Sequence, residues 1–147
     1  MSAAYEPMVG RYLRLTLGGL ACRVYVEEAG QGIPLICLHT AGADGRQYRH
    51  LLTDHEVTDR FRVIVFDMPW HGKSSPPEGW QDTDYQLTTA AYLEMVLALA
   101  DALALEQPVV MGCSIGGRAV LHLARLHGAR LGAVIGLQSS AMVEPYY

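Results

Sequence analysis

Residues 109–121 read Val-Val-Met-Gly-Cys-Ser-Ile-Gly-Gly-Arg-Ala-Val-Leu, an apolar run followed by Gly-x-Ser-x-Gly and a helical pattern. A serine hydroxyl is a poor nucleophile unless the fold exposes it and a base takes its proton. A sharp turn from strand to helix exposes it, and Gly112 and Gly116 leave room for that turn. The N–H of Ile115 can then donate to a developing oxyanion. The stretch predicts that Ser114 is a nucleophile at such an elbow, with a structural glycine-rich turn as the alternative.

Two kinds of strand pattern precede this stretch. Residues 11–17 and 20–28 alternate polar and apolar side chains on either side of a Gly-Gly pair, which predicts an antiparallel hairpin at a sheet edge. The runs 33–38 and 61–66 are apolar without alternation. Strands covered on both faces have this pattern, so these two runs predict the centre of a parallel sheet.

Helical patterns separate and follow these strands. A short helix is predicted around 47–52 and a longer one over 88–105, where apolar residues recur at helical spacing. The helix after Ser114 is predicted to end at Gly128, as its C-terminal cap. Residues 131–137 are apolar and predict one more buried strand. A solvated stripe on the helix after Ser114 is predicted from Arg118, His122 and Arg125.

The order of these elements predicts an α/β fold. It has a mostly parallel sheet with helices on both faces and an antiparallel hairpin at its N-terminal edge. Ligands of such sheets bind beyond the carboxyl ends of the strands. Three loops leave such ends, after Leu38, after Phe66 and at Ser114. We therefore expect the functional residues on these loops.

Composition narrows the class of protein. The 147 residues are 50% hydrophobic, enough for one domain with a core, and carry a net charge of −4 from interleaved charges. This predicts neither a nucleic-acid nor a membrane partner. Three cysteines in apolar stretches favour reduced thiols, and residues 1–10 lack signal-peptide features. We therefore expect a soluble cytoplasmic protein. No metal-ligand spacing is present, and no cofactor is expected.

The chain resembles the α/β-hydrolase superfamily, of the esterase, lactonase and C–C hydrolase kind. The resemblance runs from about Arg11 to the end and rests on three motifs in the expected order. These are His-Thr-Ala-Gly at 39–42, Asp-Met-Pro-Trp-His-Gly-Lys-Ser at 67–74 and Gly-Cys-Ser-Ile-Gly-Gly at 112–117. It implies that residues 1–147 are the N-terminal portion of one α/β-hydrolase domain, whose lid and C-terminal strands are absent from this chain.

The resemblance also implies roles for single residues. Ser114 would be the nucleophile, and the backbone N–H groups of Ile115 and Ala41 would form the oxyanion hole. The family usually has glycine where this chain has Thr40, and glycine again where it has Trp70, so we expect the Trp70 indole to shape the pocket. The residues expected to line the substrate pocket are His39, Thr40, Gly42, Trp70, His71 and Cys113.

The base and the acid are expected from outside the chain, because the family's triad runs Ser, Asp or Glu, then His. His39 and His71 are expected to brace their loops rather than to act as bases. Glu144 follows a predicted strand end, but a solvated glutamate is favoured there over a catalytic acid. Arg46 and Tyr48 either reach the pocket mouth or cap and pack the short helix.

These residues predict a serine hydrolase that cleaves a small carboxylic ester or lactone through an acyl-enzyme. Hydrolysis of a C–C bond and acyl transfer are alternatives on the same fold. A hydrolase-like binding or signalling module without turnover is an alternative of another class. Because no later segment could pair with the apolar strand at 131–137, we also expect a complementary polypeptide that carries the C-terminal half.

Overall fold

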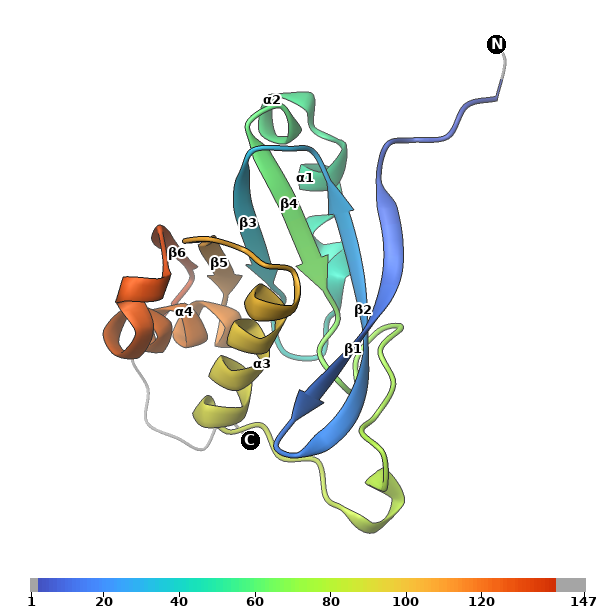
Figure 1. Cartoon of the computed structure of the whole chain (residues 1–147), viewed down its shortest axis with the longest axis vertical. Helices are drawn as coiled ribbons and strands as arrows, with labels where there is room; N and C mark the ends of the chain where they lie inside the picture. Colours follow the sequence, from blue (N-terminus) through green and yellow to red (C-terminus); the bar gives the residue numbers. More distant parts are fainter. Residues whose placement is uncertain (1–2, 140–147) are drawn as a thin grey trace.

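A six-stranded sheet with the order β1-β2-β4-β3-β5-β6 organises the computed structural model, which describes residues 3–139 (Figure 1). The strands are β1 Val9–Leu17, β2 Leu20–Ala29, β3 Ile33–Leu38, β4 Phe61–Phe66, β5 Val109–Cys113 and β6 Ala133–Leu137. β1 pairs with β2, and β2 with β4, in antiparallel fashion, while β4, β3, β5 and β6 are parallel. The predicted edge hairpin and parallel centre are confirmed.

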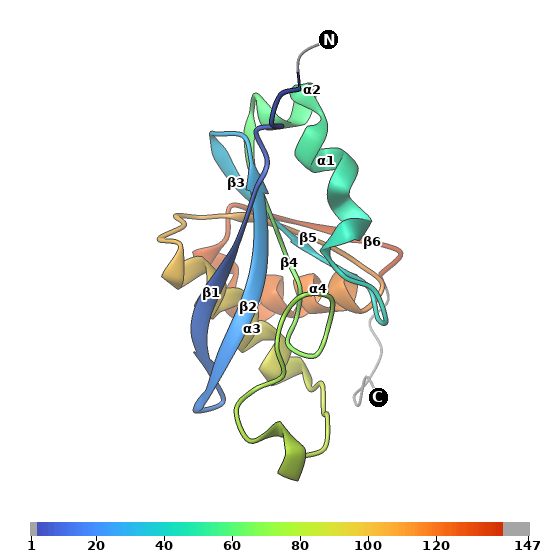
Figure 2. The same ribbon diagram turned by 90° about the vertical axis from the view of Figure 1, so that its right-hand side faces the viewer.

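Helices cover both faces of this sheet. η1 Gly45–Tyr48, α1 Arg49–Thr53 and α2 His55–Thr58 follow β3; η2 Trp80–Asp82 and α3 Thr89–Ala102 follow β4; α4 Ile115–His127 and η3 Gly128–Arg130 follow β5. α3 and α4 lie on one face and α1 on the other (Figure 2). This is the predicted α/β architecture, built from two layers of helices around a sheet.

Two hydrophobic clusters on opposite faces explain the apolar runs of the central strands. In β3, Ile36 and Leu38 are buried in the cluster with α3 and α4, whereas Leu35 and Cys37 are buried in the cluster with α1. Successive side chains of a strand point to opposite faces, so both sets must be apolar. β4 follows the same rule. The absence of alternation in the sequence therefore reflects burial on both sides.

The two longer helices differ slightly from their predicted bounds. α3 begins after Thr88, whose hydroxyl accepts a hydrogen bond from the Ala91 N–H at 3.2 Å. It ends at Ala102, because Ala104 takes a left-handed conformation (φ 50°). Gly128 caps α4, as predicted, but its φ of −55° is right-handed and the chain continues into η3.

Two predictions of exposure and burial are wrong. Arg118 does not lie on a solvated stripe: it is buried, because the first turns of α4 pack directly against the sheet. The strand predicted at 131–137 begins at Ala133 and is largely exposed, with Ile135 and Leu137 about two-fifths accessible. The reason is its place at the edge, since among residues 3–139 it pairs with β5 alone.

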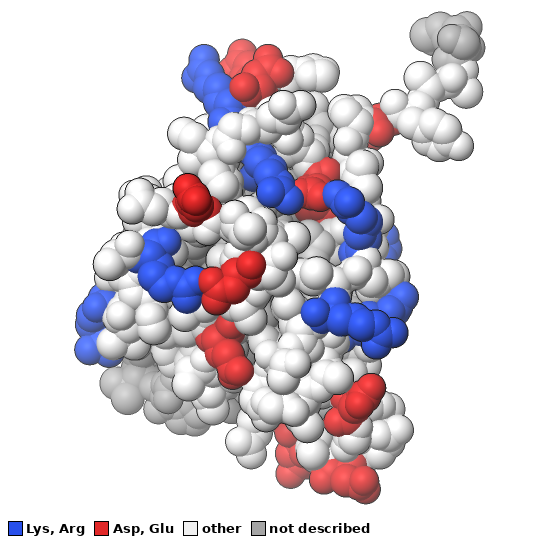
Figure 3. All heavy atoms as spheres, viewed as in Figure 1, with Lys and Arg blue, Asp and Glu red and all other residues white. Residues whose placement is uncertain are grey.

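Charged side chains of both signs are interspersed over the face shown in Figure 3, without a large area of one sign. Within the described residues, no helix has the length and apolar character needed to cross a membrane.

Candidate active site

Ser114 is the one residue between the end of β5 and the start of α4, and it is exposed. Its backbone takes φ 56° and ψ −112°, a conformation that is rare for a residue with a side chain. The turn is tied on both sides. The Ser114 N–H donates to the Leu137 carbonyl of β6 at 3.0 Å, and the Arg118 N–H donates to the Ser114 carbonyl at 2.9 Å. The strand–turn–helix geometry predicted around this serine is therefore present.

Two glycines permit the close approach on which this turn depends. A Cβ on Gly112 would lie 2.3 Å from the carbonyl carbon and oxygen of Gly116. A Cβ on Gly116 would lie 2.6 Å from the carbonyl oxygen of Leu38 in β3. Both distances are far below van der Waals contact, and the atoms involved belong to the backbone. Glycine is needed at 112 and 116 so that α4 can start directly above the sheet.

The two residues expected to supply the oxyanion donors, Ile115 and Ala41, line the same cavity. Ile115 is the first residue of α4, so its N–H has no acceptor within the helix and lies at the positive end of the helix dipole. Ala41 belongs to the loop after β3. A cavity of about 400 Å³ is lined by both residues together with Gly42, His71, Tyr85 and Leu87. The sheet order explains this, because β3 lies between β4 and β5 and their carboxyl-end loops meet there.

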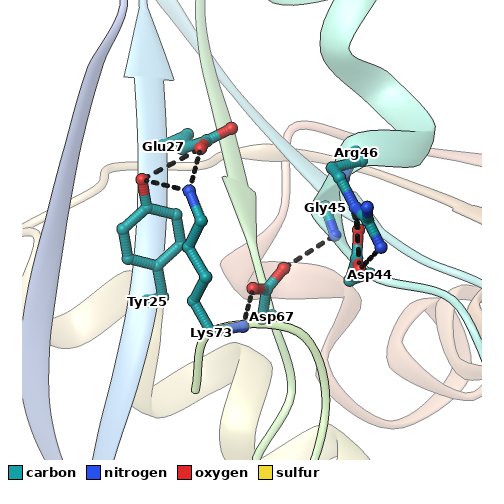
Figure 4. Close-up of polar contacts among 7 residues, drawn as sticks. All are labelled: Tyr25, Glu27, Asp44, Gly45, Arg46, Asp67 and Lys73. Carbon is teal, nitrogen blue, oxygen red and sulfur yellow. Dashed lines mark hydrogen bonds and ion pairs between the residues drawn. The ribbon is translucent and has the colours of Figure 1, made fainter.

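The carboxylate of Asp67 holds the loops after β3 and β4 together (Figure 4). It is buried, and its two oxygens accept hydrogen bonds at 2.7 Å, one from the Gly45 N–H and one from the Lys73 N–H. The Ser74 hydroxyl donates to the Asp67 carbonyl at 2.6 Å and accepts from the Tyr25 N–H at 2.8 Å. The sequence analysis did not predict this role for Asp67. The spacing between Asp67 and Ser74 in the motif at 67–74 is the signal that could have indicated it.

Arg46 and Tyr48 belong to the helix, not to the pocket mouth. Asp44 caps η1 by accepting from the Arg46 N–H, and its carboxylate pairs with the Arg46 guanidinium at 2.6 Å (Figure 4). Hydrogen bonds from Arg46 lower the pKa of Asp44 to about 2. The Tyr48 hydroxyl donates to the Leu38 carbonyl at 2.9 Å, and its ring is buried beside α1. Of the two alternatives for these residues, the structure therefore shows that they cap and pack the short helix and do not reach the pocket mouth.

His39 lies beneath the cavity instead of on its wall, which corrects its expected place in the pocket. It is fully buried, and its Nε2 accepts a hydrogen bond from the Met68 N–H at 3.1 Å. Its Nδ1 lies 2.9 Å from the Thr40 carbonyl, so this nitrogen carries the proton and donates. Burial lowers the pKa of His39 and keeps the ring neutral. Both nitrogens are engaged, so His39 braces two loops and has no lone pair left for a base.

His71 is the histidine that the structure places on the cavity wall. Its Nδ1 lies 3.0 Å from the Pro69 carbonyl, and its ring centre is 5.1 Å from that of His39 and 6.0 Å from that of Tyr85. Thr40 and Cys113 do not line this cavity among the described residues. The Thr40 N–H donates to Gln47, and the Cys113 thiol lies 3.7 Å from a side-chain oxygen of Gln138.

Trp70 takes a left-handed φ of 72°, a backbone conformation that favours glycine. Its ring packs edge-on against Trp80 at 5.5 Å and tilted against Tyr85 at 5.7 Å, measured between ring centres. It lines a second cavity, of about 290 Å³, that shares Tyr85 and Leu87 with the first. The expected pocket residues are thus divided between two adjoining cavities.

Comparison with known proteins identifies the family. Residues 33–145 match the family model described as alpha/beta hydrolase fold. The chain belongs to the α/β-hydrolase family. Hydrolases of this fold, among them esterases and C–C hydrolases, are its relatives. Within residues 3–139, no group of three or more His, Cys, Asp or Glu side chains is placed to hold a metal ion.

Three similar proteins illustrate the match. The α/β hydrolase is 34% identical over 117 residues to a pimeloyl-[acyl-carrier protein] methyl ester esterase of Aeromonas hydrophila. This match covers 80% of the chain and 42% of the esterase. The chain is 28% identical over 141 residues to a 2-hydroxymuconate semialdehyde hydrolase of Pseudomonas sp. strain CF600, a match that covers 95% of this chain and 47% of the relative. A solved structure of an esterase from Thermogutta terrifontis shares the fold, with a TM-score of 0.72 and 24% identity. The match covers 84% of this chain and 44% of the esterase. The chain spans less than half the length of these proteins.

Proposed function

We propose that this α/β hydrolase is a serine hydrolase that cleaves a small carboxylic ester or lactone through an acyl-enzyme on Ser114. The observation that carries the proposal is the exposed, left-handed Ser114 directly before the free N–H of Ile115 at the start of α4. A backbone of this kind costs about 1–3 kcal/mol and is found mainly where an active site uses it. The unstrained alternative, a turn with glycine at 114, would fold more easily and has no nucleophile.

In the proposed reaction the Ser114 Oγ attacks the carbonyl carbon, and its proton passes to a histidine. The carbonyl oxygen becomes an oxyanion that accepts hydrogen bonds from the N–H groups of Ile115 and Ala41, each donor contributing about 3–4 kcal/mol to the transition state. The alcohol oxygen takes the proton and leaves, remaining tethered in a lactone. Water then attacks the acyl-enzyme, and the same histidine moves its proton to Ser114 Oγ, which releases the carboxylic acid. The reaction needs neither metal nor organic cofactor.

We also propose that the histidine and the acid come from a complementary polypeptide that pairs with the edge of β6 to which no strand within residues 3–139 is paired. Three observations support this proposal. The apolar side chains of Ile135 and Leu137 are exposed on that strand, and such an edge is normally covered. His39 has both ring nitrogens engaged. The relatives are more than twice as long as the matched segment. Glu144, the acid considered in the sequence, lies outside the described residues.

Hydrolysis of a C–C bond is the second candidate, favoured by the 28% identity to the 2-hydroxymuconate semialdehyde hydrolase over nearly the whole chain. The same Ser114 and oxyanion donors serve either reaction, since both cleave a bond next to a carbonyl. Turnover of 2-hydroxymuconate semialdehyde in preference to p-nitrophenyl acetate would replace the ester proposal by this one. We further propose a cytoplasmic location, because a reducing compartment suits the three free cysteines.

Labelling with a biotinylated fluorophosphonate, followed by peptide mapping, tests the role of Ser114. We expect the label on Ser114 in the native protein, and loss of label and of esterase activity in Ser114→Ala at an unchanged melting temperature. Activity of that variant above about a hundredth of wild type points to another nucleophile. Absence of label in an assembly that contains the second polypeptide would identify a binding module without turnover.

The mass of the native assembly tests the complementary polypeptide. We expect a second polypeptide in native mass spectrometry and unchanged labelling in His71→Ala. A chain that labels as a monomer, and loses the label in His71→Ala, identifies His71 as the base and contradicts the complementary polypeptide.

A further inference from the structure

The cavity of about 290 Å³ beside the candidate active site has an apolar interior. It lies between the β1–β2 hairpin and the segment 68–87, which runs along β2 and is held there by hydrogen bonds such as the one from the Glu78 N–H to the Ala21 carbonyl (Figures 1 and 2). Met68, Leu87 and Met95 form a buried floor. Its charged lining residues, Asp84 and Glu94, are exposed. A ligand group inside the cavity therefore meets mainly carbon atoms.

This cavity adjoins the one that contains the oxyanion donors. Tyr85 and Leu87 line both cavities, so the two share a wall that is one side chain thick. The adjacent residues Trp70 and His71 line one cavity each. A substituent on a molecule whose carbonyl is bound beside Ile115 has to pass Tyr85 and Leu87 to reach Trp70.

The conformation of Trp70 is a second observation that points to use of this cavity. An aromatic residue with φ 72° is strained, because this left-handed backbone conformation favours glycine. Trp80 and Tyr85 pack against the indole and hold it at the cavity wall. Strain that the surrounding structure maintains commonly marks a binding or catalytic feature. Here the feature is the flat apolar wall that the indole provides.

We propose that this cavity is the subsite for an apolar substituent of the substrate, either a single aromatic ring or a short alkyl chain. The inference rests on the proposed function, since it assigns the substituent to an ester or lactone whose carbonyl meets Ser114. A cavity of about 150 Å³ is enough to bind benzene, so 290 Å³ has room for a substituted aromatic ring. Aromatic and alkyl groups gain from burial against such a lining, and charged groups lose their hydration there.

A matched pair of variants on α3 tests the subsite. Ala90 and Ala91 are both exposed on the first turn of α3, but only Ala91 lines the cavity, so we expect the phenyl group of Ala91→Phe, and not that of Ala90→Phe, to occupy it. The protein is labelled with 5-fluorotryptophan, which gives one ¹⁹F resonance for each of its two tryptophans. The variant Trp80→Phe assigns the two resonances. Benzyl alcohol is then added as the ligand while the ¹⁹F spectrum is followed. We expect a saturable shift of the Trp70 resonance, at least tenfold weaker binding in Ala91→Phe, and binding within twofold of wild type in Ala90→Phe. Glycerol, a polar control, should cause no shift.

An unresponsive Trp70 resonance, or equal affinity in Ala91→Phe and wild type, overturns the subsite. The same titration in Ser114→Ala separates this inference from the proposed function, because benzyl alcohol binding does not need the hydroxyl. Binding that persists in a protein that fluorophosphonates never label supports the cavity as a ligand site and refutes the role of Ser114. Where Ser114 does label, a benzyl-bearing fluorophosphonate should react at least tenfold faster than a methyl-bearing one, and Ala91→Phe should remove that advantage.

Discussion

Replacement of Gly112 by alanine measures how much the turn at Ser114 depends on close backbone contact. The new Cβ would lie 2.3 Å from the Gly116 carbonyl carbon and oxygen and 2.8 Å from the Gly117 nitrogen. Ordinary van der Waals contact begins at about 3.4 Å, so α4 must move away from β5 by roughly 1 Å. The atoms in the way belong to the first turn of a helix and cannot rotate aside.

The expected loss of stability follows from this geometry. Overpacking of a well-packed interior costs about 1–3 kcal/mol, and rigid backbone neighbours place Gly112→Ala at the upper end. For a chain of this length, 3 kcal/mol corresponds to a fall in melting temperature of about 6–12 °C. The same movement displaces the Ile115 N–H from the cavity, so fluorophosphonate labelling should fall as well.

Gly128→Ala is the matched control for this variant. Gly128 has a right-handed φ of −55°, and a Cβ there would meet no heavy atom within 4 Å. Alanine at such a site stabilises by about 0.4–1 kcal/mol, because it restricts the unfolded chain. Thermal melting followed by circular dichroism should therefore shift in opposite directions for the two variants. Equal shifts, or a Gly112→Ala protein that melts like wild type, would refute the close contact between β5 and α4.

Two further predictions concern buried groups. Burial lowers the pKa of His39 below its ordinary 6.5, so on acidification the unfolded chain binds a proton before the folded chain does. The contribution of His39 to the free energy of unfolding is therefore complete above about pH 6.5. It falls as the pH drops below that value, by up to about 1.4 kcal/mol per pH unit. Urea unfolding should show the stability gap between wild type and His39→Gln narrowing from pH 7.5 to pH 5.5; a constant gap contradicts a neutral His39. Burial also raises the pKa of Cys37 to about 12, so iodoacetamide at pH 8 should alkylate the half-buried Cys113 in the native protein and spare Cys37. Peptide mass spectrometry measures both, and equal alkylation would disprove the difference.

Local pattern was enough to predict the sheet. The unbroken apolar runs of β3 and β4 result from burial on two faces, and the alternating runs of β1 and β2 result from burial on one, so hydropathy distinguished these two central strands from the edge hairpin. The turn around Ser114 was predictable for a related reason. Gly112 is required by its close contact with Gly116 four residues later, and a short motif can report a contact of this kind.

Features that depend on distant contacts were not predictable in this way. Arg118 has the spacing of a solvated residue, yet α4 starts so close to the sheet that its first turns are buried. The exposure of Ile135 depends on which strand pairs with β6, and strand pairing is a property of the whole fold. The left-handed Trp70 could be suspected only from its alignment with a glycine, since the aromatic neighbours that hold it, Trp80 and Tyr85, lie 10 and 15 residues away.

The motifs at 39–42 and 67–74 each contain one residue that holds neighbouring loops and one residue that lines the cavity. His39 and Asp67 are buried, and their side chains bind backbone N–H groups of the neighbouring loops. Ala41 and His71, a few residues further on, line the cavity. A neutral imidazole and a carboxylate can be buried here because every hydrogen bond they need comes from those loops. The loops after β3 and β4 are therefore fixed to one another by buried side chains, and the turn before Ile115 is held by hydrogen bonds to Leu137 and Arg118.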